Sequence, residues 1–267
     1  MTDHGVSLDL EQVSILLSDD GRETIERQRL GVLMNLLATL PPPPDAAELF
    51  PQYPALRDRF LAASHGDDGE LLEERFLEFY AHLHMHEAPY TASERQRVDA
   101  TGGYWSHAGG LSPILKAGSW IHPETVSVDI GAGNGLQALL MQKMYPHARC
   151  CQIEISSVMV DIGRRLQEWL EIPESRVEWR VDDVLETDLG GWSFVYLYRP
   201  VRPVGPGEGF YNRLVSALDE EPTEVVIFSI ADCLGEFLPE TFERFYTDGH
   251  LTCYRKPTIM SVEPPSG

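Results

Sequence analysis

Two patterns of hydrophobic and polar residues divide the chain near residue 100. Before that point, apolar residues recur three or four positions apart, which predicts amphipathic helices. One such pattern covers 22–40 and ends at the proline run 41–44, which cannot continue a helix. A second pattern covers 69–86, and no strand pattern precedes residue 126. The first hundred residues are therefore predicted to be helical.

Both helical patterns are interpreted as faces that pack into a hydrophobic core. The first stripe comprises Ile25, Val32, Leu33, Leu36, Leu37 and Leu40, with Leu30 at its margin. The second comprises Leu72, Phe76, Phe79, Tyr80 and Leu83.

From residue 126 onward, short apolar runs alternate with helical patterns. This βαβ rhythm predicts an α/β fold, a doubly wound Rossmann-like parallel sheet with helices on both faces, preceded by an N-terminal helical domain. A last pair of runs suggests a hairpin around Asp248 and Gly249. The predicted strands are 125–130, 148–155, 176–181, 192–198, 223–230, 242–247 and 250–256, and the helices are 136–145, 156–172 and 208–218.

A glycine loop follows the first predicted strand with the spacing D-x-G-x-G-x-G, from Asp129 through Gly131 and Gly133 to Gly135. Glycine has no Cβ, so such a loop lets the backbone approach a ligand closely. A nicotinamide fingerprint requires Gly or Ala where this chain has Leu136. A P-loop is excluded because the G-K-[ST] sequence is missing.

This loop resembles motif I of the class I S-adenosylmethionine (SAM) dependent methyltransferases, and the resemblance extends over roughly 101–256. Glu154 ends the second predicted strand, where the family places the acid that binds the ribose hydroxyls. Two acceptor oxygens on one carboxylate suit a vicinal diol. Asp183 follows the third strand, where the family's acid meets the adenine amino group, and Asp182 is a close rival. The resemblance thus implies SAM as cofactor, bound by Asp129, Gly131, Ala132, Gly133, Gly135, Glu154, Ile155, Asp182, Asp183 and Val184. A nucleotide-sugar or dinucleotide site is the alternative.

The catalytic residues are less well specified, because the sequence YRPVRP stands where many amino-group methyltransferases have N/D-P-P-Y. Tyr198 and Arg199 leave the fourth strand toward the expected pocket and are candidates. A packing aromatic and a structural ion pair are their structural alternatives. Asp232, after the fifth strand, is interpreted as a helix cap rather than a pocket residue.

A second group of candidates lies between two Gly-Gly pairs upstream of the glycine loop. Tyr104 is expected to line the methyl pocket. His107 is a candidate base, since its reference pKa suits neutral pH. A linker between domains is the alternative reading of this segment.

His82, His84 and His86 alternate, but on a helix successive members of this series point to different sides, so no metal site is predicted. The four cysteines form neither a disulfide framework nor a C-x-x-C pattern, and Cys150 and Cys151 are expected to be buried in the second strand. A cytoplasmic location is therefore expected.

Composition constrains the partners. Forty-two acidic residues against 21 Lys and Arg give a formal net charge of −21. Such a field repels phosphate backbones, so nucleic acid is not expected as a partner. Increased solubility is the plainer explanation of the acidity. No apolar run is long enough to cross a membrane, and no membrane partner is expected.

These observations predict two domains, a helical lid or substrate domain over 1–100 and a SAM-binding methyltransferase domain over 101–267. The leading functional hypothesis is SAM-dependent methyl transfer to a small-molecule acceptor. The alternatives are a protein methyltransferase with a Lys- or Arg-rich target and a non-catalytic SAM-binding protein. The sequence leaves the acceptor atom, the need for a general base and the oligomeric state open.

Overall fold

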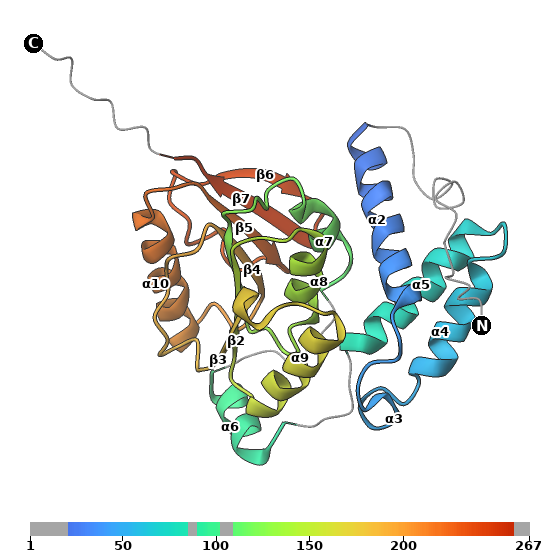
Figure 1. Ribbon diagram of the computed structural model, residues 1–267. Helices are drawn as coiled ribbons and strands as arrows, with labels where there is room; N and C mark the ends of the chain where they lie inside the picture. The colour runs from blue at the N-terminus through green and yellow to red at the C-terminus, as the bar shows by residue number, and fades with distance from the viewer. Residues whose placement is uncertain (1–20, 85–89, 102–108, 259–267) are drawn as a thin grey trace, which may run out of the picture.

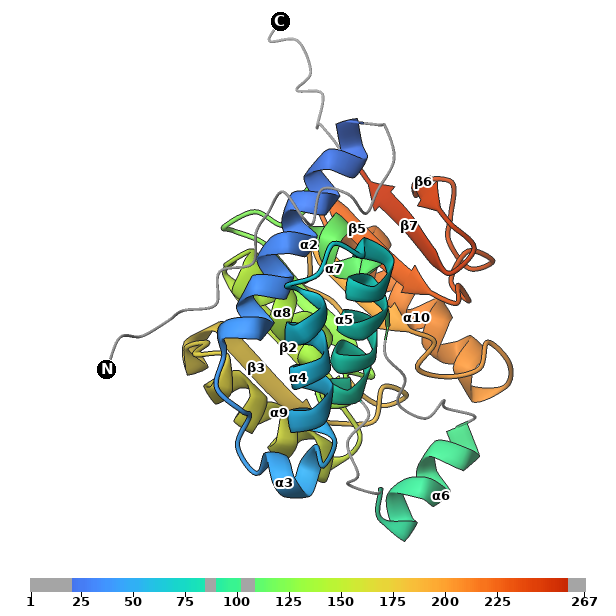
Figure 2. The ribbon, with the colours of Figure 1, turned by 90° about the vertical axis from the view of Figure 1, so that its right-hand side faces the viewer.

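The computed structural model describes residues 21–84, 90–101 and 109–258 (Figure 1). Within these ranges, a seven-stranded sheet has helices on both faces. Helices α7, α8 and α9 cover one face and α10 covers the other (Figure 1). Helices α2, α4 and α5 form an outer layer beyond α7 and α8, whereas α6 lies apart from them (Figures 1 and 2).

The strand order is β3-β2-β1-β4-β5-β7-β6. Strands β1 to β5 are parallel, and β7 is antiparallel to both β5 and β6. All predicted strands are present, including the hairpin around Asp248 and Gly249. Their bounds are β1 Val126–Ile130, β2 Arg149–Glu154, β3 Val177–Val181, β4 Phe194–Tyr198, β5 Val225–Ile230, β6 Glu243–Thr247 and β7 Leu251–Lys256.

The described helices also follow the predicted order. Before the sheet lie α2 Gly21–Thr39, α3 Ala46–Leu49, α4 Tyr53–Ala63, α5 Gly69–His84, α6 Ala92–Thr101 and α7 Ser112–Ala117. The helices that alternate with the strands along the chain are α8 Leu136–Met144, α9 Ser157–Trp169, the 3-10 turn Glu174–Arg176 and α10 Pro206–Glu220.

The predicted apolar face of α2 is partly wrong. Ile25 and Val32 are 49% and 54% exposed, whereas Met34 and Ala38 are buried beside the predicted Leu33 and Leu37. The helix is therefore rotated from the face that spacing alone selects. Packing against α7 fixes this rotation, and Arg29 donates to the carbonyl of Leu115 at 2.6 Å.

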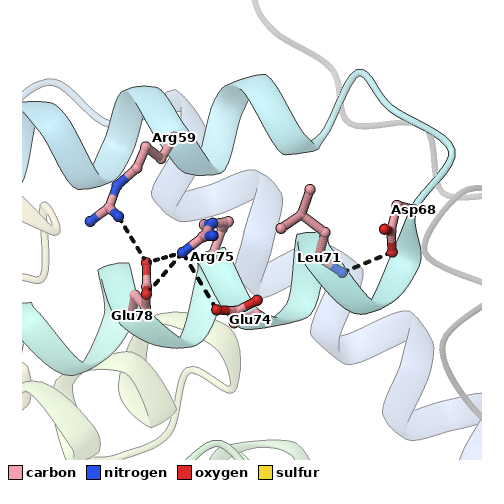
Figure 3. Close-up of polar contacts among 6 residues, drawn as sticks. All are labelled: Arg59, Asp68, Leu71, Glu74, Arg75 and Glu78. Atoms are coloured by element: carbon pink, nitrogen blue, oxygen red, sulfur yellow. Dashed lines mark hydrogen bonds and ion pairs between the residues drawn. The ribbon is translucent and has the colours of Figure 1, made fainter.

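The predicted face of α5 is confirmed, since all five of its apolar residues are buried against α4 and the core. The opposite surface carries ion pairs that join the two helices (Figure 3). Both carboxylate oxygens of Glu78 accept from Arg75 at 2.9 Å, and Arg59 of α4 lies 3.6 Å from Glu78. Asp68 accepts from the Leu71 N–H at 3.0 Å and so caps the start of α5.

One hydrophobic cluster runs from the N-terminal helices α2, α4 and α5 into α8, α9 and one face of the sheet. A second cluster joins the other face to α10. The domain boundary at residue 100 therefore remains a prediction. No helix in the described ranges is long and apolar enough to span a lipid bilayer.

A buried lysine from β7 binds the carbonyl groups at the C-terminal end of α10. Lys256 on β7 is 1% exposed, and its ammonium donates to the carbonyls of Leu218, Asp219 and Glu221 at 2.7, 2.7 and 2.6 Å. A cation suits these carbonyls, because the last turn of a helix leaves carbonyl groups without helical partners.

Candidate functional site

The glycine loop makes a tight turn between β1 and α8. Gly131, Gly133 and Gly135 have φ values of 77°, 59° and 68°, a region that other residues adopt at a cost. The N–H groups of Gly131 and Ala132 both donate to the carbonyl of Ile153, at 2.9 and 3.0 Å. The loop is thereby held against the end of β2.

A cavity of about 300 Å³ lies above this loop, at the carboxyl ends of the strands. Ligands of doubly wound sheets bind at this edge. Nine of the ten predicted cofactor residues line the cavity: Asp129, Gly131, Ala132, Gly133, Glu154, Ile155, Asp182, Asp183 and Val184.

Gly135 is the predicted cofactor residue that does not line the cavity. A Cβ at this position would meet the Trp179 ring at 2.5 Å and the Gln152 side chain at 2.9 Å. This glycine therefore permits close packing of α8 against the sheet, and the cofactor role predicted for it is not supported by its position.

Glu154 is oriented toward the cavity by the backbone around it. Its Oε2 accepts from the Gly133 N–H and its Oε1 from the Ser156 N–H, both at 2.9 Å. Burial raises the pKa of Glu154 to about 7, although these N–H donors favour the ionised form. The carboxyl thus titrates near neutral pH.

A second buried carboxyl, Asp129, lies on the same wall. It is 2% exposed, and both burial and the charge of Glu154 hold its pKa well above the usual range. Two carboxyls in one cavity favour a ligand that brings positive charge or hydrogen-bond donors.

The two acids after β3 both reach the cavity but differ in their contacts. Asp183 accepts from the Leu185 N–H at 3.0 Å and pairs with Arg97 at 3.4 Å. Asp182 accepts from the hydroxyl of Thr187 at 2.9 Å. Both candidates for the acid that meets the adenine amino group therefore lie at the cavity.

Of the predicted catalytic residues, Tyr198 and Arg199 line the cavity. The Tyr198 ring meets the His250 ring edge-on, with centroids 6.0 Å apart. Arg199 has a φ of 45° and donates to the sulfur of Cys233 at 3.1 Å. Their catalytic roles stay predictions.

Two further catalytic candidates, Tyr104 and His107, lie outside the described residues. Asp232 does not line the cavity, but no helix follows it before β6, so its interpretation as a helix cap is wrong and it stabilises a turn instead. Its carboxylate accepts from the Leu234 N–H at 3.0 Å and from the Tyr254 hydroxyl at 2.6 Å.

A buried polar network that reaches the cavity wall at Gln137 was not predicted from the sequence. The Tyr80 hydroxyl contacts the Gln137 side chain, and both donate to the carbonyl of Gly110, at 3.2 and 3.1 Å. Burial and the charge of Asp129 raise the pKa values of Tyr80 and Tyr196. Tyr196 was predictable, because it precedes Tyr198 by two positions and so faces the same side of β4.

Among the described residues, no group of three potential metal ligands is found. That the alternating histidines bind no metal stays a prediction. His82 and His84 lie on α5, and His86 falls outside the described ranges. Cys150 and Cys151 are buried in β2, as expected.

The chain matches no family model, and no curated protein matches its sequence. An RNA methyltransferase from Salinibacter ruber, solved with S-adenosyl-L-homocysteine, is 23% identical, with a TM-score of 0.41 over 57% of this chain and 94% of that one. TrmN from Thermus thermophilus is 16% identical, with a TM-score of 0.41 over 64% and 55%. The N-methyltransferase NodS from Bradyrhizobium japonicum is 14% identical, with a TM-score of 0.41 over 55% and 93%.

One expectation is corrected by these matches. The prediction that nucleic acid is not a partner is wrong as an exclusion, because an RNA methyltransferase is among the similar structures. Net charge describes the field of the whole molecule and does not decide what a local surface binds.

The similarities are low, so the fold assignment rests on the strand order and glycine loop described above. In the mixed seven-stranded sheet, the five parallel strands β1 to β5 are followed by the two strands of the antiparallel β6–β7 hairpin. Helices cover both faces, and a cavity lies at the strand ends. The chain has the Rossmann-like fold of the class I methyltransferases.

Proposed function

We propose that the protein is a SAM-dependent methyltransferase. The observation that carries this proposal is the position of Glu154, which the Gly133 and Ser156 N–H groups orient into the cavity beside the glycine loop. An oriented carboxylate with two acceptor oxygens fits the two hydroxyls of a ribose.

The other cavity residues fit the remaining parts of the cofactor. Asp129, a buried residue of the cavity wall just before the glycine loop, suits the ammonium group at the amino-acid end of SAM. Asp183 and the buried Val184 suit a base that has an amino group and an apolar face. The cofactor would supply a methyl group bound to a positively charged sulfur.

The chain's own residues would bring the acceptor to that methyl group. Tyr198 and Arg199 line the cavity at the end of β4 and are proposed to orient the acceptor. Such positioning supplies most of the catalysis in a group transfer that needs no covalent enzyme intermediate. Tyr104 and His107 remain proposed catalytic residues outside the described ranges.

A small-molecule acceptor is the first candidate, because helices of the N-terminal region contribute to the cavity wall. His84 of α5 and Val98 of α6 line it together with the strand ends. A Lys- or Arg-rich protein and RNA are the other acceptors to be tested, and a non-catalytic SAM-binding protein is the remaining alternative.

The first experiment is a thermal-shift comparison of SAM, S-adenosylhomocysteine and NAD on the wild type and Glu154→Ala. A ligand that binds only the native state raises the melting temperature. Stabilisation by the two sulfur-containing ligands, lost in the variant, is expected. Stabilisation by NAD alone, or by none of the three, would refute the proposal. Labelled SAM offered to metabolite pools, basic proteins and RNA then identifies the acceptor class, and the absence of transfer to all of them would favour a non-catalytic role.

A further inference from the structure

The segment from Tyr90 to Val98, which the glycine-loop resemblance does not reach, lines the same cavity as the predicted cofactor residues. Tyr90 and Val98 contact the cavity together with Glu154 and Asp183. Tyr90 therefore lies on the wall of the cavity that also holds the carboxyl expected to bind the ribose. In agreement with this position, burial and the charges of Glu154 and Glu94 raise the pKa of Tyr90.

Two reciprocal hydrogen bonds begin helix α6 directly after Tyr90. The Thr91 N–H donates to the Glu94 carboxylate at 2.6 Å, and the Glu94 N–H donates to the Thr91 hydroxyl oxygen at 3.2 Å. This capping box satisfies two N–H groups that a helix start leaves without partners. Arg95 adds a bond to the carbonyl of Tyr90 at 3.0 Å. The position of Tyr90 is therefore fixed by the helix that follows it.

Glu94 also ties α6 to α9. Its side chain is buried and receives hydrogen bonds from the Ser156 hydroxyl and the Ser157 N–H. Burial raises the pKa of Glu94, but these bonds and those from Thr91 outweigh it and leave the pKa below its usual value. The Ser156 N–H donates to Glu154. Ser156 therefore connects Glu94 of α6 with Glu154, whose carboxylate is expected to bind the ribose.

An ion pair also connects α6 with Asp183, the acid that follows β3. Arg97 lies 3.4 Å from the Oδ2 of Asp183, while Oδ1 of the same carboxylate accepts from the Leu185 N–H. The Arg97 side chain is half exposed, and Asp183 is largely buried. A half-exposed pair contributes little to stability, but it sets the direction in which Asp183 points.

We propose that the segment Tyr90–Val98 is the outer wall of the adenosine half of the cofactor pocket. Tyr90 is a cofactor-contacting residue that supplies an aromatic surface to the nucleoside. Arg97 is a positioning residue that acts through Asp183. This inference rests on the proposed function for the identity of the ligand, and it assigns residues that the glycine-loop resemblance does not include.

The test is isothermal titration calorimetry of the full chain with S-adenosylhomocysteine and with adenosine. Because stacking of a base on an aromatic ring contributes to affinity, Tyr90→Ala is expected to weaken both ligands by about tenfold. Tyr90→Phe keeps the ring and is expected to bind within about twofold of the wild type. Gln96→Ala, at an exposed position of the same helix, is the matched control and is expected to bind as the wild type does.

The role of Arg97 is tested by Arg97→Ala and by the double variant with Asp183→Asn. If Arg97 acts through Asp183, the two changes are not additive, because removing either partner removes the same effect. Arg97→Ala is expected to weaken S-adenosylhomocysteine by about threefold, and added salt should reduce this difference. Equal or tighter binding by Arg97→Ala would overturn its positioning role.

The outcomes separate this inference from the proposed function. If the wild type binds neither S-adenosylhomocysteine nor adenosine, the proposed function fails. If the wild type binds both and Tyr90→Ala binds them equally well, the proposed function stands and the assignment of Tyr90 is wrong. Melting temperatures without ligand identify any variant that loses affinity because it is unfolded. If Tyr90→Ala is unfolded, Tyr90→Phe alone tests the aromatic contact. A tenfold loss of affinity in folded Tyr90→Phe would overturn that contact.

Discussion

Cofactor affinity is expected to rise with pH through neutrality, because Glu154 must be ionised to accept two ribose hydroxyls. Burial raises the pKa of this carboxyl from 4.5 to about 7. Below that pH the carboxyl carries a proton and offers one acceptor fewer to the diol. A single protonation with a pKa of about 7 weakens the apparent affinity about tenfold at pH 6 relative to pH 8.

Calorimetry with adenosine at pH 6, 7 and 8 measures this dependence, since adenosine keeps the diol and lacks the amino-acid group of SAM. Two buffers of different ionisation enthalpy report the proton release on binding, which should be about half a proton at pH 7 and close to one proton at pH 6. Glu154→Gln should bind weakly and without this pH dependence. A wild-type affinity that is flat between pH 6 and 8 would refute the reasoning. An unchanged pH dependence in Glu154→Gln would assign the titration to Asp129 instead.

The same carboxyl makes the unliganded protein less stable as pH rises. A carboxyl whose pKa is raised in the folded state contributes stability below its unfolded pKa, and this contribution is lost as pH rises through the folded value. For Glu154 the window runs from 4.5 to about 7. The loss amounts to about 3 kcal/mol in the free energy of unfolding. Urea denaturation at several pH values in this window measures the free energy of unfolding. It should fall more steeply with pH in the wild type than in Glu154→Gln, and an equal pH dependence of the two proteins would contradict the raised pKa of the buried carboxyl.

Three further predictions concern stability. Lys256→Met removes three hydrogen bonds at the end of α10 and should lower the free energy of unfolding, measured by urea denaturation, by about 3 kcal/mol. The control Lys143→Met removes one long ion pair of a half-buried lysine to the exposed Glu171 and should change this free energy by less than about 0.5 kcal/mol. Gly135→Ala drives a Cβ into a packed indole ring and should cost about 1–3 kcal/mol more than Gly191→Ala, which has a similar φ and nothing within 4 Å. Equal melting temperatures for these two variants would show that packing at Gly135 is not limiting. Ser156→Ala removes the N-cap of α9 and should cost about 1 kcal/mol, and an unchanged melting temperature would contradict the capping role.

The strands and helices around the sheet could be predicted from local periodicity, whereas most residues of the cavity were predicted from the resemblance of the glycine loop and the strand ends to a known family. Alternating strand and helix patterns give the parallel order, and parallel strands bring their carboxyl ends to one edge. Residues at the end of a strand or just after it, such as Glu154 and Asp183, therefore lie close to one another at this edge. The cofactor role of Gly135 stays a prediction, because spacing shows that a position requires glycine but not whether a ligand or the Trp179 ring demands it.

The N-terminal wall of the site could not be predicted in this way. Arg97 and Asp183 are 86 positions apart in sequence, and no period of a helix or strand relates them. The exposure of Ile25 and Val32 has the same origin, since neighbouring elements decide which face of a helix packs. Strand-end reasoning therefore recovers the part of the pocket that the sheet supplies. The part that the N-terminal helices supply depends on how they pack against it, and this is where residues that select the acceptor are expected to lie.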